Sequence, residues 1–169
     1  MFRKRRLVSL LNKSKGFTII EMLVTLTIIS ILAAIAVPYV EITIKRSKEM
    51  ELRAALRTIR TAIDEFNGDW KKGVISKFCD CFSEAGYPKN LYILVEGVDI
   101  AGTVSQKKKY LRKIPVDPFA DQSLPAEEQW GLRSYNDKPD SRTWSGEDVY
   151  DIYTKSEKKA IDGSYYVDW

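Results

Sequence analysis

Residues 15–21, with the sequence KGFTIIE, place one carboxylate, Glu21, near the start of a long apolar run. An ionised carboxylate in the apolar part of a membrane is costly, roughly 2.5 to 3.5 kcal/mol on insertion scales for an aspartate at a helix centre and less near the edge. An ordinary anchor gains nothing from that cost. We therefore expect Glu21 to have a partner.

Enzyme chemistry has little support in this sequence. There is no histidine, which excludes Ser-His-Asp and Cys-His triads, histidine-ligated zinc and the usual general base near neutral pH. Carboxylate or lysine chemistry stays conceivable, but a pair such as Asp148 and Asp151 is equally typical of acidic strand ends. We predict a structural protein and not an enzyme.

The two cysteines, Cys79 and Cys81, are separated by a single residue. Zinc sites use more ligands and usually wider spacing. The pair is therefore interpreted as two small, partly buried side chains or as a local disulfide formed in an oxidising compartment.

The net charge of +4 in this chain of 169 residues comes from its first sixteen residues. That leader has six basic residues and no acid, whereas the other 153 residues carry 21 basic and 23 acidic side chains. A basic cluster at Lys107, Lys108 and Lys109 has no accompanying aromatic platform or recognition motif. We therefore expect no nucleic-acid partner.

The 24 residues from Phe17 to Val40 form the apolar run. A helix of this length spans about 36 Å, enough to cross a hydrocarbon core of about 30 Å with some tilt. The basic leader should stay in the cytoplasm and the remainder should cross the membrane. A secretory signal peptide, cleaved near Ala34-Ile35-Ala36, and a plain anchor are alternatives, but both leave Glu21 unexplained.

Beyond Pro38, where we expect a helix kink, residues 41–68 continue as an amphipathic helix. Its apolar stripe follows spacings of four, three, four and three residues, and the arginines lie on other faces. Gly68 is the expected stop. The stripe consists of Leu52, Leu56, Ile59, Ile63 and Phe66.

Residues 69–169 are expected to form a globular α+β domain. Residues 69–86 indicate a connecting loop, and the apolar stretch that follows Pro88 could be a helix. Residues 130–135 and 147–156 are typical of strands, and Asp162-Gly163 predicts a turn. A long helix packed on a small antiparallel sheet is the predicted fold class.

Residues 15–38 resemble the N-terminal signature of type IV prepilins and of the pseudopilins of type II secretion. In that family a membrane peptidase cuts on the cytoplasmic side of the span, and the new N-terminus is usually N-methylated. The resemblance is carried by the basic leader, the Gly16-Phe17 junction, Thr18, Glu21 and an apolar run that reaches Pro38.

The resemblance implies cleavage after Gly16, with residues 1–16 as the leader, and N-methylation of Phe17. Residues 17–40 then serve as a transmembrane and assembly helix. Glu21 is implied to pair with the Phe17 ammonium of a neighbouring subunit. Because either charge alone is penalised in a low-dielectric core, the pair is satisfied only at the correct offset between subunits.

The later blocks GYP, YLRKIPVDPF, WGLRSY, DVYDIYTKS and AIDG, with the final Trp169, look like the major pseudopilin of type II secretion, general secretory pathway protein G. The resemblance implies a subunit of a pseudopilus that drives protein export across the outer membrane. It implies a single-pass protein of the bacterial inner membrane with a periplasmic C-terminal domain, which later forms a periplasmic filament.

The implied partners are other copies of the chain, membrane lipid, the prepilin peptidase, minor pseudopilins, and an inner-membrane assembly platform with its ATPase. The nearest alternative is a true type IV pilin for adhesion, motility or DNA uptake. A soluble enzyme with a signal peptide is the alternative from another class, and it predicts loss of residues 1–36.

Many major pseudopilins bind one calcium ion near the last strand, so the resemblance also implies a possible calcium site. Calcium takes six to eight oxygen ligands. The alternative is that the candidate carboxylates are turn caps and solvated strand ends, because they spread over 21 positions without a closely spaced Asp-Asp pair. The candidates are Asp162, Asp168, Asp148 and Asp151.

Overall fold

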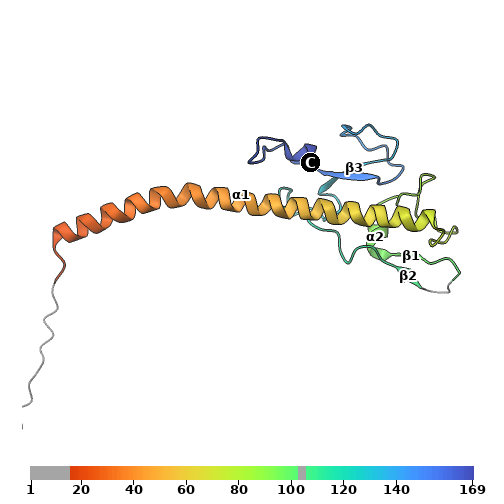
Figure 1. The fold of residues 1–169 in the computed structure, drawn as a ribbon, viewed down its shortest axis with the longest axis horizontal. Coiled ribbons are helices and arrows are strands. Elements are labelled where there is room, and N and C mark those ends of the chain that lie inside the picture. Colours follow the sequence, from red (N-terminus) through yellow and green to blue (C-terminus); the bar gives the residue numbers. More distant parts are fainter. Residues whose placement is uncertain (1–15, 103–105) are drawn as a thin grey trace, which may run out of the picture. The chain divides into compact units, whose positions relative to one another are not determined.

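The computed structural model describes residues 16–102 and 106–169, except for the side chains of residues 37 and 38. The expected leader lies outside the described residues apart from Gly16. The chain divides into two compact units, residues 1–42 and residues 43–169. Helix α1, Ile19–Lys71, contributes to both units (Figure 1).

In the first unit, α1 is predominantly apolar, and three of its hydroxyl groups are satisfied within the helix. Each donates a hydrogen bond of 2.7–3.0 Å to a backbone carbonyl three or four residues earlier. A helix in lipid must satisfy its polar groups internally, so these side chains suit a membrane span. The three donors are Thr25, Thr27 and Ser30.

In the second unit, α1 supplies the centre of the hydrophobic core. The five residues of the expected apolar stripe are all buried, with exposed fractions of 0–3%, and this prediction is confirmed. They pack in one cluster with residues from the body that include Trp130 and Ile152. Most of the stability of such a helix comes from burying this face rather than from its propensity.

The sequence predicts that the helix stops at Gly68, but it continues to Lys71. Asn67 donates side-chain hydrogen bonds of 3.1 Å to the carbonyls of Ala85 and Gly86, which holds this end of the helix against the body. The stop is Gly73, whose φ of 70° lies in the left-handed region that favours glycine. Sequence inspection chose the wrong one of two nearby glycines.

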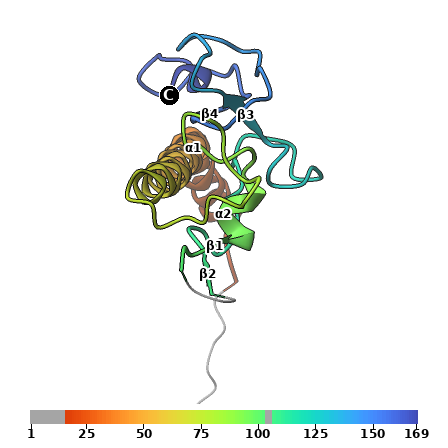
Figure 2. The same ribbon diagram turned by 90° about the vertical axis from the view of Figure 1, so that its right-hand side faces the viewer.

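The body has two small antiparallel ribbons instead of one sheet. After helix α2, Tyr92–Glu96, strand β1, Val98–Asp99, pairs with β2, Lys107–Lys108. Strand β3, Trp130–Arg133, pairs with β4, Asp151–Thr154, in the register Gly131 to Tyr153. The two ribbons lie on opposite sides of α1 (Figure 2). A short 3-10 helix, η1, Tyr166–Asp168, follows β4.

The predicted α+β class is confirmed. The short helix after Pro88 and the two main strands are present within the expected ranges, whereas β1 and β2 carried no strand signal. Gly131 is required in β3 because a Cβ there would lie 2.3 Å from the Tyr153 ring. An aromatic ring that covers a glycine on the neighbouring strand fixes the pairing of the two strands.

Lys108 on β2 joins the small ribbon to the end of α1. Its Nζ lies 2.6 Å from Asp69 Oδ2 and 2.9 Å from Glu65 Oε1, and the Tyr110 hydroxyl donates to Asp69 at 2.9 Å. Burial raises the pKa of Asp69, but the hydrogen bonds from Lys108 and Tyr110 outweigh it, so this pKa is lowered. The hydrogen bond to Asp69 raises the pKa of Lys108.

Replacing Lys108 with methionine should lower the free energy of unfolding by about 1 to 3 kcal/mol at pH 7. Because the pKa of Asp69 is lower in the folded state, its interactions stabilise the fold at any pH above the unfolded-state pKa. This stabilisation is lost as the pH falls through the folded-state pKa. Because the pKa of Lys108 is higher in the folded state, its interactions stabilise the fold at any pH below the unfolded-state pKa. This stabilisation is lost as the pH rises through the folded-state pKa. The difference in the free energy of urea unfolding between wild type and variant should therefore be larger at pH 7 than at pH 3. An equal difference at both pH values would contradict this account.

Candidate functional site

The segment around the expected cleavage point is open. Gly16 is exposed, has no regular secondary structure, and would have no atom within 4 Å of an added Cβ. Phe17 is 76% exposed. The backbone on both sides of the Gly16-Phe17 bond is thus accessible to a peptidase.

Glu21 lies in the first turn of α1, beside a cap that sequence inspection missed. The Glu21 backbone N–H donates to Thr18 Oγ1 at 3.2 Å. Thr followed three residues later by Glu is the capping-box pattern, which could have identified this cap. The carboxylate itself is exposed, and none of the ion pairs found among the described residues involves Glu21. Its charge therefore has no ionic partner among the residues that the structure describes.

The apolar surface around Glu21 is uncovered. Among the described residues, α1 is the one helix long and apolar enough by length and composition to cross a membrane, and its most apolar window is 0% buried. Exposed apolar patches of this kind mark interaction sites with lipid or protein. Pro38 lies within the bounds of α1, and the expected kink there stays a prediction.

The carboxylates of the expected calcium site lie in different local environments and have different partners. Asp148 is buried and accepts hydrogen bonds from Ser83 Oγ at 2.5 Å and from the Tyr135 backbone N–H at 2.9 Å. Asp162 caps a turn, where hydrogen bonds from Ser164 hold its pKa below the usual range. Asp168 belongs to η1.

Asp151 is neutralised by two arginines, Arg60 at 2.7 Å and Arg133 at 3.2 Å. In the part of the chain that the structure describes, no group of three or more acidic or cysteine side chains is arranged to hold a metal ion. The residues present therefore do not fit the four-carboxylate calcium site. Guanidinium groups already supply the positive charge, and Asp148 and Asp162 act as caps.

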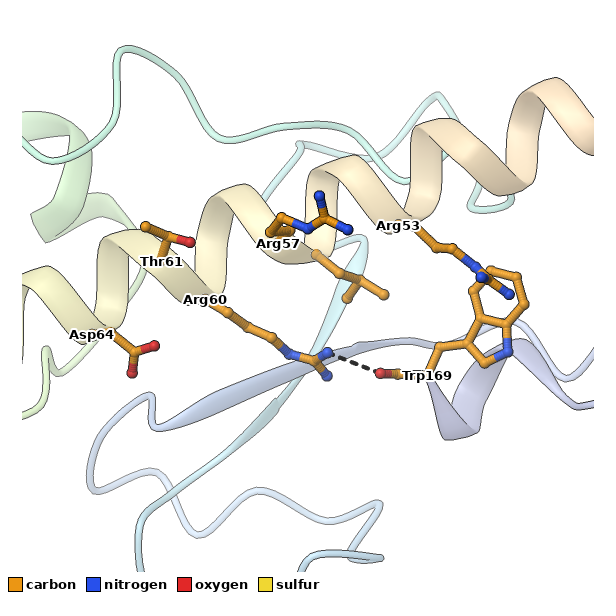
Figure 3. Close-up of a pocket in the computed structure, with 7 residues that line it drawn as sticks. Arg53, Arg57, Arg60, Thr61, Asp64 and Trp169 are labelled. Carbon is orange, nitrogen blue, oxygen red and sulfur yellow. Dashed lines mark hydrogen bonds between the residues drawn. The ribbon is translucent and has the colours of Figure 1, made fainter.

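Arg60 makes a set of long-range contacts in the body that the sequence did not predict. The sequence places it only on a face away from the apolar stripe, yet its three nitrogens donate to Asp151 Oδ1 at 2.7 Å, to the Trp169 carbonyl at 2.9 Å and to the Ile152 carbonyl at 3.0 Å. It thus ties α1 both to β4 and to Trp169, the residue that follows η1. Figure 3 shows the hydrogen bond to Trp169. The sequence spacing of Arg60 does not distinguish it from Arg53 and Arg57 on the same helix.

A pocket of about 440 Å³ lies beside this contact. Arg53 covers the Trp169 ring at 4.0 Å and pairs with Asp162 at 3.5 Å. Arg57, Thr61 and Asp64 complete its rim (Figure 3). The pocket is open to solvent, and no side-chain nucleophile is hydrogen-bonded to an activating base among its lining residues.

The two cysteines form a disulfide, Cys79–Cys81. The local disulfide was one of the two alternatives expected from the sequence. It is compatible with an oxidising compartment, where such bonds persist.

The comparisons with known proteins agree with the N-terminal signature. Residues 11–37 match the prokaryotic N-terminal methylation motif. The chain is 41% identical over 68 residues to a type IV major fimbrial protein FimA of Dichelobacter nodosus, which is 40% of each chain. It is 37% identical over 67 residues to the type IV major alpha-pilin of Moraxella bovis, covering 40% of this chain and 42% of that one.

Fimbrial protein Q of Moraxella bovis is 41% identical over 54 residues, or 32% of this chain and 34% of that one. The chain thus spans about 34–42% of the length of the curated relatives it matches. No solved structure matches. These relatives are structural subunits by name, in line with the expectation of a protein that is not an enzyme. The chain therefore carries the N-terminal methylation motif and is similar to type IV major pilins over about 40% of its length.

Proposed function

We propose that this chain is a filament subunit of the type IV pilin kind, which is held in the bacterial inner membrane as a precursor and polymerises through its N-terminal helix. The observation that carries the proposal is the uncovered apolar surface of α1 together with the Glu21 carboxylate, which has no ionic partner among the described residues. Lipid can cover the apolar side chains but cannot neutralise the charge. A second copy of the chain can do both.

The proposed assembly step pairs Glu21 of one subunit with the Phe17 ammonium of the next. The ammonium exists only after cleavage at Gly16, so the uncut precursor lacks the partner and stays in the membrane. Because donor and acceptor belong to different surfaces of the subunit, the contact is heterologous and generates an open helical filament. Extraction from the bilayer is proposed to use an assembly platform and its ATPase.

Two kinds of filament fit this mechanism. The similarity to major pilins supports a surface pilus, for adhesion, motility or DNA uptake, as the first candidate. The second candidate is a periplasmic pseudopilus of type II secretion, with minor pseudopilins as partners. It is supported by the sequence blocks that resemble its major subunit, which supply the buried side chains Leu111, Ile114 and Asp117.

A strain that lacks this chain distinguishes the two candidates. Loss of surface filaments and twitching with normal secretion would establish the pilus. Exoproteins trapped in the periplasm with pili intact would establish the pseudopilus. A strain normal in both respects would contradict the proposed function.

Processing makes a separate prediction. The mature protein should begin at Phe17 and weigh one methyl group more than its sequence, because the peptidase is proposed to cut after Gly16 and to methylate the new N-terminus. Intact-mass spectrometry of membrane-extracted protein measures this. A chain that begins after Ala36 would instead indicate a cleaved signal peptide, and a Gly16→Pro variant should accumulate uncut.

A further inference from the structure

Residues 76–81, named here the Phe78 tip, form a loop that is fixed at both ends. The Ser76 N–H donates to the Asp99 carbonyl at 2.9 Å, and the Lys89 N–H donates to the Cys81 carbonyl at 3.1 Å. An ion pair joins Asp80 to Lys89. The Cys79–Cys81 disulfide closes the tip itself. The loop is therefore held in one conformation without any contact from its central side chain.

That central side chain is an uncovered phenyl ring. Phe78 is 101% exposed, whereas the next most exposed aromatic side chain described in the second unit, Tyr135, is 55% exposed. A disulfide, an ion pair and two backbone hydrogen bonds thus hold a loop whose central apolar side chain is exposed to solvent. Aromatic anchors on fixed supports are the usual centres of protein interfaces.

The described part of the chain also has a mostly apolar pocket of about 400 Å³. The start of α2 and strands β3 and β4 form its walls, with Leu91, Trp130 and Leu132 as apolar lining. Concave sites with aromatic walls and a few polar groups are typical binding sites. Both signs of charge are present at its rim, from Glu127, Glu128, Arg142 and Lys155.

The charges of the tip and the rim are complementary. Lys77 and Asp80 flank Phe78 and are exposed, so one basic and one acidic group accompany the ring. The rim carboxylates of Glu127 and Glu128 can pair with Lys77, whereas Asp80 is already paired with Lys89. A phenyl ring fits a pocket of this volume, and Phe78 does not occupy the pocket of its own chain because the ring is fully exposed.

We propose that the Phe78 tip of one subunit inserts into the pocket lined by Leu91, Trp130 and Leu132 of a second copy of the chain. This inference rests on the proposed function, because it adds a contact between the bodies of filament subunits to the contact between their helices. Knob and pocket are different surfaces, so each subunit gives its tip to one neighbour and receives the tip of another. Repetition of that contact extends a filament and does not close a dimer.

The test is photo-crosslinking in the assembled filament. Benzoylphenylalanine is placed at position 78 of the full-length chain, filaments are irradiated, and cross-linked peptides are identified by mass spectrometry. The expected result is a ladder of dimers, trimers and longer chains, cross-linked to peptides that contain residues 90–92, 127–132 or 142–144. The same reagent at Tyr165, an exposed aromatic residue outside the pocket, should not mark these peptides.

Two variants give an independent measurement. Phe78→Ser should lower the filament yield at least roughly fivefold, whereas Phe78→Leu, which keeps an apolar knob, should lose much less. Neither should shift the melting temperature of the detergent-solubilised monomer, because the Phe78 side chain is fully exposed. Normal filament yield from Phe78→Ser would overturn the proposal.

The outcomes separate this contact from the proposed function. Filaments that cross-link from position 78 to other peptides, only as closed dimers, or not at all would overturn the tip-and-pocket contact and leave the filament subunit intact. A wild-type chain that forms no filament would overturn both.

Discussion

Replacing Glu21 with alanine is expected to leave membrane insertion intact and to reduce the filament yield at least roughly tenfold, a change that corresponds to about 1.4 kcal/mol per subunit contact. Insertion should improve slightly, because a carboxylate is removed from the apolar region. Assembly should fail because the Phe17 ammonium of the neighbouring subunit is left unpaired in a low-dielectric core, which costs more than the pair was worth.

The structure excludes a trivial explanation for such a failure. The Thr18 cap uses the backbone N–H of residue 21, so the alanine variant keeps the cap and the start of α1. Glu41→Ala is the matched control, since Glu41 is another exposed acid in the first unit and should leave the yield unchanged. Sheared filaments and the membrane fraction are quantified by immunoblot. A normal yield from the Glu21 variant would end the pairing hypothesis.

Replacing Arg60 with alanine is expected to lower the free energy of unfolding of the body by about 2 to 3 kcal/mol. Three charge-assisted hydrogen bonds are lost together, and the bonds to charged groups are the stronger class. The side chain is about one third exposed, so the full value of a buried ion pair is not reached. Asp151 keeps Arg133 as a second partner, which limits the loss further.

Arg57→Ala is the matched control for Arg60, because Arg57 lies on the same helix, is exposed, and has no hydrogen bond or ion pair among those found for the described residues. Its removal should change the free energy of unfolding by less than about 0.5 kcal/mol. Arg60→Lys should recover only part of the loss, since lysine cannot reproduce the planar fork of donors. Chemical unfolding monitored by tryptophan fluorescence measures all three, and equal losses for the two alanine variants would contradict the assignment of Arg60.

Most of the predictions from sequence rested on two features, the helical spacing of apolar residues and the charge of Glu21 within an apolar segment. The buried stripe of α1 could be foreseen because helical spacing alone determines which side chains share a face. Strands β3 and β4 could be foreseen from their β-branched and aromatic residues. Glu21 stood out because few side chains are so costly in an apolar segment.

The missed features depend on contacts between distant parts of the chain. Arg60 resembles Arg53 and Arg57 in sequence, and only the arrival of Asp151 and Trp169 from residues about ninety to a hundred and ten positions away distinguishes it. Gly73 rather than Gly68 ends α1 because tertiary hydrogen bonds of Asn67 hold the last turn in place. The expected calcium ligands were chosen because they are all aspartates, whereas in the structure Asp151 forms ion pairs with Arg60 and Arg133.

The central claim is that copies of this chain assemble through their N-terminal helices with Glu21 neutralised by a neighbour. A cryo-electron microscopy structure of filaments purified from cells tests it most directly. The account predicts subunits that begin at Phe17, apolar helices at the filament centre, and the Phe17 nitrogen of one subunit within about 4 Å of Glu21 of another, the limit for an ion pair. A filament in which Glu21 faces solvent or pairs within its own chain would contradict it.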